Sequence, residues 1–94
     1  MPQFLIERLM PGVAHLDVDD LKQTSRAGLH VLKKDHPEIH WLQTYVTKDA
    51  LYWVYQAPDE QELRRYTDKS TLPVHRILEV GAVIDPATLE VDEG

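Results

Sequence analysis

Apolar positions recur with two different periods along the chain and divide it into strand-like and helical segments. Residues 3–10 (QFLIERLM) mix aromatic, aliphatic and β-branched side chains and stop at a Pro-Gly dipeptide, which is typical of a strand followed by a turn. From Asp17 onward, leucines recur at helical spacing, with aspartates at the start and lysines at the end, as the helix dipole favours. This segment is predicted to be an amphipathic helix that ends before Pro37.

The second half of the chain repeats the alternation of strands and helix. Residues 39–46 (IHWLQTYV) and 50–57 (ALYWVYQA) are rich in aromatic and β-branched side chains, and the polar residues between them predict a hairpin. Asp59 stands three residues ahead of Glu62, the spacing of a helix N-terminal capping box. A second helix is therefore predicted there, followed by a last strand over residues 74–84.

The order strand, helix, strand, strand, helix, strand defines an α+β fold of the ferredoxin-like type. We expect a four-stranded antiparallel sheet with both helices on one face. The predicted domain covers residues 1–86, and residues 87–94 form an acidic C-terminal tail in which Leu89 and Val91 could add a short fifth strand.

Both faces of this sheet are predicted to be apolar. In the hairpin, Trp41 and Tyr45 alternate with Leu42 and Val46, so neither parity is polar enough to face water. Monomers rarely expose an apolar patch of more than a few hundred Å². The sequence therefore predicts a homodimer in which two sheets pack face to face as a dimeric α+β barrel or sandwich.

Composition narrows the classes of partner. The chain has 94 residues, a net charge of −6 and only ten lysines and arginines, so we expect no nucleic-acid partner. It has no cysteine, which excludes disulfides and thiolate chemistry. No apolar run approaches the ~20 residues that span a bilayer. Without a signal-like start, we expect a cytoplasmic protein.

Two glutamates interrupt the predicted outer strands. Glu7 stands mid-strand between apolar residues, and Glu79 holds a similar place in the last strand. Because the first and last strands of this fold are neighbours, the two carboxylates are expected to approach each other. One interpretation pairs each with an arginine, such as Arg8 or Arg76; the other is a polar patch that binds a metal ion or small ligand.

The stretch HPEIHW (residues 36–41) offers candidate metal ligands. Pro37 disfavours a helical His-x-x-x-His site, and in an extended chain Glu38 and His40 would point to one side about 7 Å apart. A lasting site needs a third ligand, from His75, His36 or a carboxylate of a second subunit. Imidazole and carboxylate groups without sulfur are compatible with nickel, zinc or cobalt.

Motifs of catalysis are absent. The sequence has no glycine-rich phosphate loop, no G-x-S-x-G elbow and no thiol nucleophile, so neither a nucleotide nor a flavin is indicated, and a non-catalytic role is favoured. The alternative is a small-molecule-binding protein or cofactor-independent enzyme of the dimeric barrel type. Its pocket would be lined by Trp41, Tyr45 or Trp53, with Glu7 or Glu79 reaching in.

Five pieces in order, FLIER, WLQTYV, VYQAPDEQELRR, LPVHRILEV and VIDP, resemble a family of short bacterial proteins of unknown function that is typified by nickel-binding members. The resemblance runs from Phe4 to Pro86. It implies a homodimer of ferredoxin-like subunits, with room for an extra short strand, that binds a divalent metal at its surface. His75 departs from the family pattern, which has an aspartate there, and the acidic tail is longer. Positions that fit the pattern are Glu7, Arg8, Trp41, Thr44, Tyr45, Val46, Tyr55, Pro58, Pro73, Arg76 and Glu79.

Overall fold

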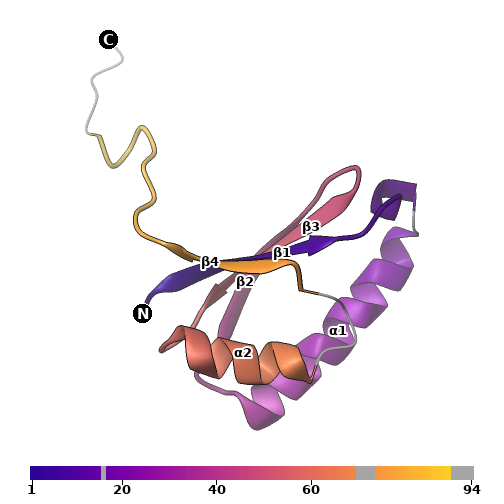
Figure 1. The fold of residues 1–94 in the computed structure, drawn as a ribbon, viewed down its shortest axis with the longest axis horizontal. Helices are drawn as coiled ribbons and strands as arrows, with labels where there is room; N and C mark the ends of the chain where they lie inside the picture. The colour runs from indigo at the N-terminus through magenta and orange to yellow at the C-terminus, as the bar shows by residue number, and fades with distance from the viewer. Residues whose placement is uncertain (16, 70–73, 90–94) are drawn as a thin grey trace.

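The computed structural model describes residues 1–15, 17–69 and 74–89 and has the predicted ferredoxin-like arrangement. Four strands lie in the order β2-β3-β1-β4, and every neighbouring pair is antiparallel. Both long helices lie on one face of this sheet (Figure 1). We call the other face the open face. None of the described helices is both long and apolar enough to cross a bilayer. The elements are β1 (Gln3–Leu9), η1 (Val13–His15), α1 (Val18–Asp35), β2 (His40–Val46), β3 (Ala50–Gln56), α2 (Glu60–Asp68) and β4 (Arg76–Val80).

The capping residues of both helices follow the sequence prediction. The Asp17 carboxylate accepts a hydrogen bond from the Asp19 N–H, and α1 ends at Asp35, before Pro37. The Asp59 carboxylate accepts from the Glu62 N–H at 2.7 Å. The Glu62 side chain does not complete the reciprocal half of a capping box; it turns to other partners, described below. These side-chain acceptors satisfy amide groups that have no partner inside the helix.

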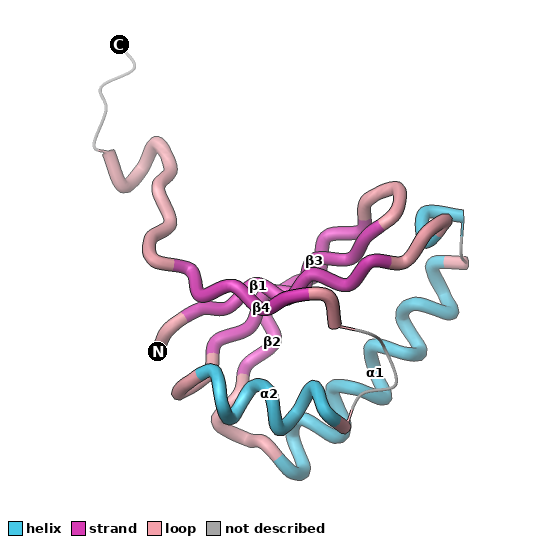
Figure 2. Tube along the Cα trace, viewed as in Figure 1, coloured by secondary structure: helices cyan, strands magenta, loops and turns pink. Residues whose placement is uncertain are grey.

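The last strand is shorter than predicted, because β4 covers Arg76–Val80 and not residues 74–84. Its final pair joins Val80 to Gln3, at the start of β1. Pro2 lies outside β1, and its carbonyl accepts a hydrogen bond from the Ala57 N–H at 3.2 Å, on the β3 side. Beyond Val80 the chain leads away from the sheet as a loop (Figure 2). Leu89 lies in a turn and not in a fifth strand, and Val91 falls outside the described residues.

A β-bulge in β2 decides which residues face the helices. Trp41 pairs with Tyr55, but the next pair joins Gln43 to Val54, so Leu42 is the extra residue. The bulge reverses the alternation, and Trp41 therefore lies on the helix side while Tyr45 lies on the open face. The core between sheet and helices is formed by apolar and aromatic side chains that include Phe4, Ile6, Leu32, Leu51, Trp53, Tyr55, Leu63, Tyr66 and Ile77.

Candidate functional site

A row of four polar and aromatic residues crosses the open face of the sheet. Tyr45 of β2 pairs with Tyr52 of β3, Tyr52 with Glu7 of β1, and Glu7 with Arg76 of β4. The Arg76 Nε donates to the Glu7 carboxylate at 2.9 Å and a second guanidinium nitrogen at 3.4 Å. These hydrogen bonds, and a weaker contribution from Tyr52, hold the pKa of Glu7 below its usual value. The hydrogen bond between Tyr52 and Glu7 raises the pKa of the Tyr52 phenol. Glu7 is therefore an ionised carboxylate in a largely buried position.

The pairing of Glu7 with an arginine is confirmed, but the expected approach of Glu79 is wrong. In the β1–β4 register Glu7 lies opposite Arg76, and Glu79 lies opposite Phe4, three positions away. Because successive residues alternate between faces, Glu79 lies on the helix side, at the edge strand, and Glu7 on the open face. The two carboxylates cannot share one ligand within a subunit.

The expected ligand set is divided in the same way. Tyr45 lies on the open face and is 55% exposed. Trp53 lies on the helix side, only 7% exposed, and stacks on Tyr55 with ring centroids 6.4 Å apart. The Arg8 guanidinium lies 5.5 Å from the centroid of the Trp53 ring, so Arg8 is not the partner of Glu7. The four predicted residues, Glu7, Tyr45, Trp53 and Glu79, therefore do not line one common pocket within the subunit.

His75, one of the predicted metal ligands, lies close to a carboxylate. Its Nε2 is 3.8 Å from the nearest Glu7 oxygen, and its backbone N–H donates to the Glu7 carbonyl at 2.8 Å. Glu38 lies in a turn closed by the Ile39 N–H and the His36 carbonyl, not in an extended strand, so the assumed 7 Å geometry with His40 is wrong. Among residues 1–15, 17–69 and 74–89, no three histidine or carboxylate side chains are grouped to hold a metal ion.

His36, weighed as a third ligand, has a structural role. It is buried, and the Lys69 ammonium donates to its Nε2 at 3.1 Å, while its Nδ1 donates to Glu62 at 2.9 Å. The hydrogen bonds from His36 and Arg65 hold the pKa of Glu62 below its usual value. Since both ring nitrogens are engaged, His36 is not available to a metal. The histidine ties the end of α1 to α2.

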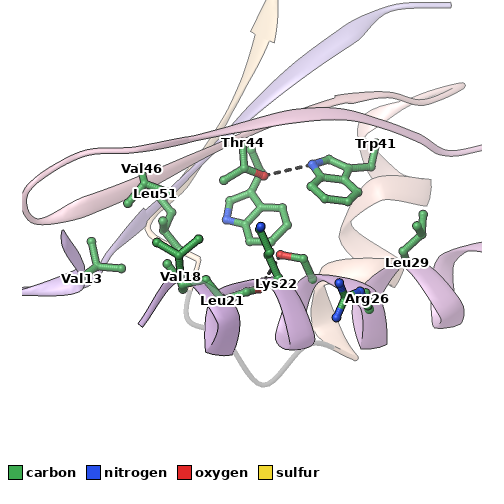
Figure 3. Close-up of a pocket in the computed structure, with 12 residues that line it drawn as sticks. Val13, Val18, Leu21, Lys22, Arg26, Leu29, Trp41, Thr44, Val46 and Leu51 are labelled. Carbon is green, nitrogen blue, oxygen red and sulfur yellow. Dashed lines mark hydrogen bonds between the residues drawn. The ribbon is translucent and has the colours of Figure 1, made fainter. Parts of the chain in front are cut away.

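A pocket that the sequence did not predict lies between α1 and the hairpin β2–β3 (Figure 3). We call it the α1 pocket. Its volume is about 410 Å³, within the range of small-molecule sites. Trp41 and Trp53 line it, as the small-molecule hypothesis anticipated, but Tyr45, Glu7 and Glu79 do not. Apart from two basic side chains its walls are mostly apolar, formed by residues that include Leu21, Ser25, Leu29, Trp41, Thr44 and Trp53.

Comparison with known proteins agrees with the fold and adds a family. The structure is similar to the crystal structure of SCO4226 from Streptomyces coelicolor A3(2), with a TM-score of 0.72 and 21% sequence identity over 87% of this chain and 99% of that chain. Comparison with curated protein sequences finds no match. A family model described as nickel responsive protein SCO4226-like matches residues 4–80, which confirms the resemblance over all but its last six positions. The chain belongs to the SCO4226-like family of nickel responsive proteins.

Proposed function

We propose that the protein is a cytoplasmic homodimer that binds a divalent transition metal ion, nickel or zinc, through histidine and carboxylate groups, without turnover. Membership of a family described as nickel responsive carries this proposal. Imidazole and carboxylate groups, with no thiolate in the chain, suit nickel or zinc ions. The described residues of one subunit do not supply such a site, so the proposal requires a second subunit.

The open face supports dimerisation. Leu5 of β1 pairs with Val54 of β3 and with Leu78 of β4, which makes an apolar row across the centre of this face. Leu78 is 42% exposed and Tyr45 is 55% exposed in the single subunit. A second copy of the same face would cover these side chains, with the Glu7–Arg76 pair beside the apolar row.

Of the proposed metal ligands, Glu38 and His40 lie at one corner of the sheet, and His75 lies at the diagonally opposite corner. β2 and β4 are its two edges, separated by three strand spacings, or about 14 Å. His40 lies in the row of paired residues that contains Gln3. His75 is next to Arg76, which pairs with Glu7, and Glu7 lies about 13 Å further along β1 than Gln3. A site that contains His40 and His75 must therefore join two subunits.

One dimer geometry meets this requirement. In this geometry the open faces pack with their strands nearly perpendicular, and the two-fold axis runs along the diagonal that joins the two corners without His40 or His75. This axis brings the His40 corner of one subunit over the His75 corner of its partner. Two equivalent sites then form at the margins of the interface, each drawing on Glu38 and His40 from one subunit and the partner's His75. We expect metal binding to strengthen the dimer, because the ion binds only the assembled site.

Calorimetric titration with nickel and with zinc tests the proposal. We expect a dissociation constant below about 100 µM for at least one metal, weakened by His40→Ala and by His75→Ala. His30→Ala, an exposed histidine on α1, is the matched control and should bind like the parent. Absence of binding, or equal binding by all three variants, contradicts the proposal. Sedimentation with nickel and with a chelator measures the coupling to dimerisation.

A small-molecule function is the second candidate, and the α1 pocket favours it. This pocket lies between α1 and the hairpin, on the side of the sheet opposite the open face. It is therefore not the pocket between two subunits that the sequence suggested. The two candidates therefore concern separate parts of the subunit and can be tested separately.

A further inference from the structure

The α1 pocket exists because most of α1 does not pack closely against the sheet. Of the side chains of this helix, Leu32, near its C-terminal end, is the buried one. Leu21 and Leu29 are half-buried and face the hairpin across the pocket (Figure 3). The N-terminal part of the helix thus covers the two tryptophans of the hairpin without filling the space above them.

One polar group of a residue that lines the pocket lacks a partner. The Trp53 indole N–H is buried and has no hydrogen-bond acceptor among the described residues. Trp41 lines the same pocket but donates its indole N–H to the Thr44 hydroxyl at 3.0 Å. A buried donor without an acceptor is costly, and native structures rarely leave one unless something else supplies the acceptor. The Trp53 N–H is therefore a donor that an oxygen atom of a ligand would satisfy.

The charge around the pocket indicates the sign of that ligand. Lys22 and Arg26 line it from one side of α1, four residues apart, and no aspartate or glutamate is among its lining residues. Figure 3 shows Lys22 extending from the helix toward the strands. Neither cation forms a salt bridge within the described part of the chain, although the protein carries a net charge of −6. Two cations without a salt bridge beside an apolar cavity attract an anion.

We propose that the α1 pocket binds a small amphipathic organic anion, a monocarboxylate with an aliphatic or aromatic body. The body lies against the leucines and tryptophans, and the carboxylate meets Lys22 and Arg26 at the mouth. The Trp53 N–H supplies a further donor to a ligand oxygen. A neutral hydrocarbon would leave that N–H without an acceptor, and an organic cation would be repelled by both basic side chains.

Titration with three eight-carbon probes tests the class of ligand. Octanoate, octan-1-ol and octylamine are added to the full chain in the presence of a chelator, so that metal binding cannot contribute. Binding is followed by tryptophan fluorescence and by the indole N–H resonances of Trp41 and Trp53. We expect octanoate to bind most tightly, octylamine least, and the Trp53 indole resonance to shift on binding octanoate. Equal affinity for octanoate and octan-1-ol, or no binding of octanoate up to about 1 mM, overturns the proposal.

Charge-neutralised variants locate the carboxylate. Exposed ion pairs each contribute modestly to affinity, so Lys22→Gln with Arg26→Gln should weaken octanoate binding about fivefold to tenfold and leave octan-1-ol unchanged. Lys33→Gln with Lys34→Gln removes the same charge from the last turn of the same helix and should change neither. A loss of equal size in both double variants would mean that net charge, not this pocket, attracts the anion.

A substitution at Trp53 addresses the role of the indole N–H. Trp53→Phe removes the N–H and keeps an aromatic ring, and should weaken octanoate more than octan-1-ol. The chemical shifts of the other residues report whether the variant keeps its fold. Unchanged discrimination between the two probes in a folded Trp53→Phe variant would exclude the N–H from recognition. Failure of these tests leaves the metal proposal untouched, because that proposal concerns the sheet corners.

Discussion

Leu78→Asp should separate dimerisation from folding. Leu78 lies on the open face of the edge strand β4, and its backbone pairs with Leu5. It is 42% exposed in the single subunit and is not among the buried core residues. An aspartate there remains solvated in the monomer but would be buried in the proposed dimer. The free energy of unfolding of the monomer should fall by only about 1 to 2 kcal/mol, because the part of the leucine that the subunit already covers is lost.

The expected effect on the dimer follows from the exposed fraction. Burying a leucine side chain completely is worth about 1.5 to 3 kcal/mol, so covering the 42% still exposed contributes about 0.6 to 1.3 kcal/mol per subunit. A two-fold interface contains this contact twice, which gives about 1.3 to 2.5 kcal/mol per dimer. Desolvating two carboxylates adds a penalty of several kcal/mol. The dimer dissociation constant should therefore rise by at least about 100-fold.

Sedimentation equilibrium over a wide concentration range measures this change, with thermal unfolding of the monomer alongside. Val83→Asp is the matched control: Val83 is 60% exposed, but it lies in the segment that leads away from the sheet. The control should dimerise like the parent. If the parent is a monomer at high concentration, or if Leu78→Asp and the parent have the same dissociation constant, the open face is not the interface. Nickel binding by Leu78→Asp should fall with dimerisation if the site joins two subunits.

Gly28→Ala should gain little stability alone, because a Cβ at Gly28 would lie 3.1 Å from the buried Tyr66 hydroxyl, which offsets the helix-propensity gain of about 1 kcal/mol. In a Tyr66→Phe background the full gain should appear in urea unfolding; the same gain in both backgrounds would refute the steric argument. Acid should destabilise the fold partly through Glu7, whose pKa is lower in the folded state than the ordinary 4.5. The unfolded state then binds more protons, so this stabilisation is full above the ordinary pKa and lost as the pH falls through the lowered one. Glu7→Gln should flatten the dependence of unfolding free energy on pH below 4.5, whereas Glu79→Gln should retain the parent's slope through Glu7, and equal slopes in all three proteins would contradict this account.

Local patterns predicted the elements well because their signals lie within a few residues. The capping aspartates, Pro37 and the polar turn between the two aromatic strands each fix a boundary through the backbone nearby. The end of β4 was predicted too late because it depends on a distant residue. That strand stops where β1 runs out at Gln3, and nothing in the sequence after Val80 reports this.

The site was harder to predict because side-chain direction depends on register. The Glu7–Arg76 pair follows from the neighbourhood of the first and last strands, which the fold type already implies. The opposite placement of Glu79 depends on which residues face each other, and a shift of one position reverses the face. The bulge at Leu42 likewise places Trp41 and Tyr45 on opposite faces of the sheet, and no glycine or proline in the sequence marks its position.

By itself the sequence determined the order of strands and helices, the helix caps and the excess of apolar side chains over what one face of the sheet can bury. These features depend on short-range periodicity and on composition, which the chain carries regardless of its partners. The tertiary structure alone decided which carboxylate meets which arginine, that the predicted metal ligands lie at separate corners, and that α1 leaves a pocket over two tryptophans. The reason is that strand register and the distance between helix and sheet are set by packing between residues far apart in the chain.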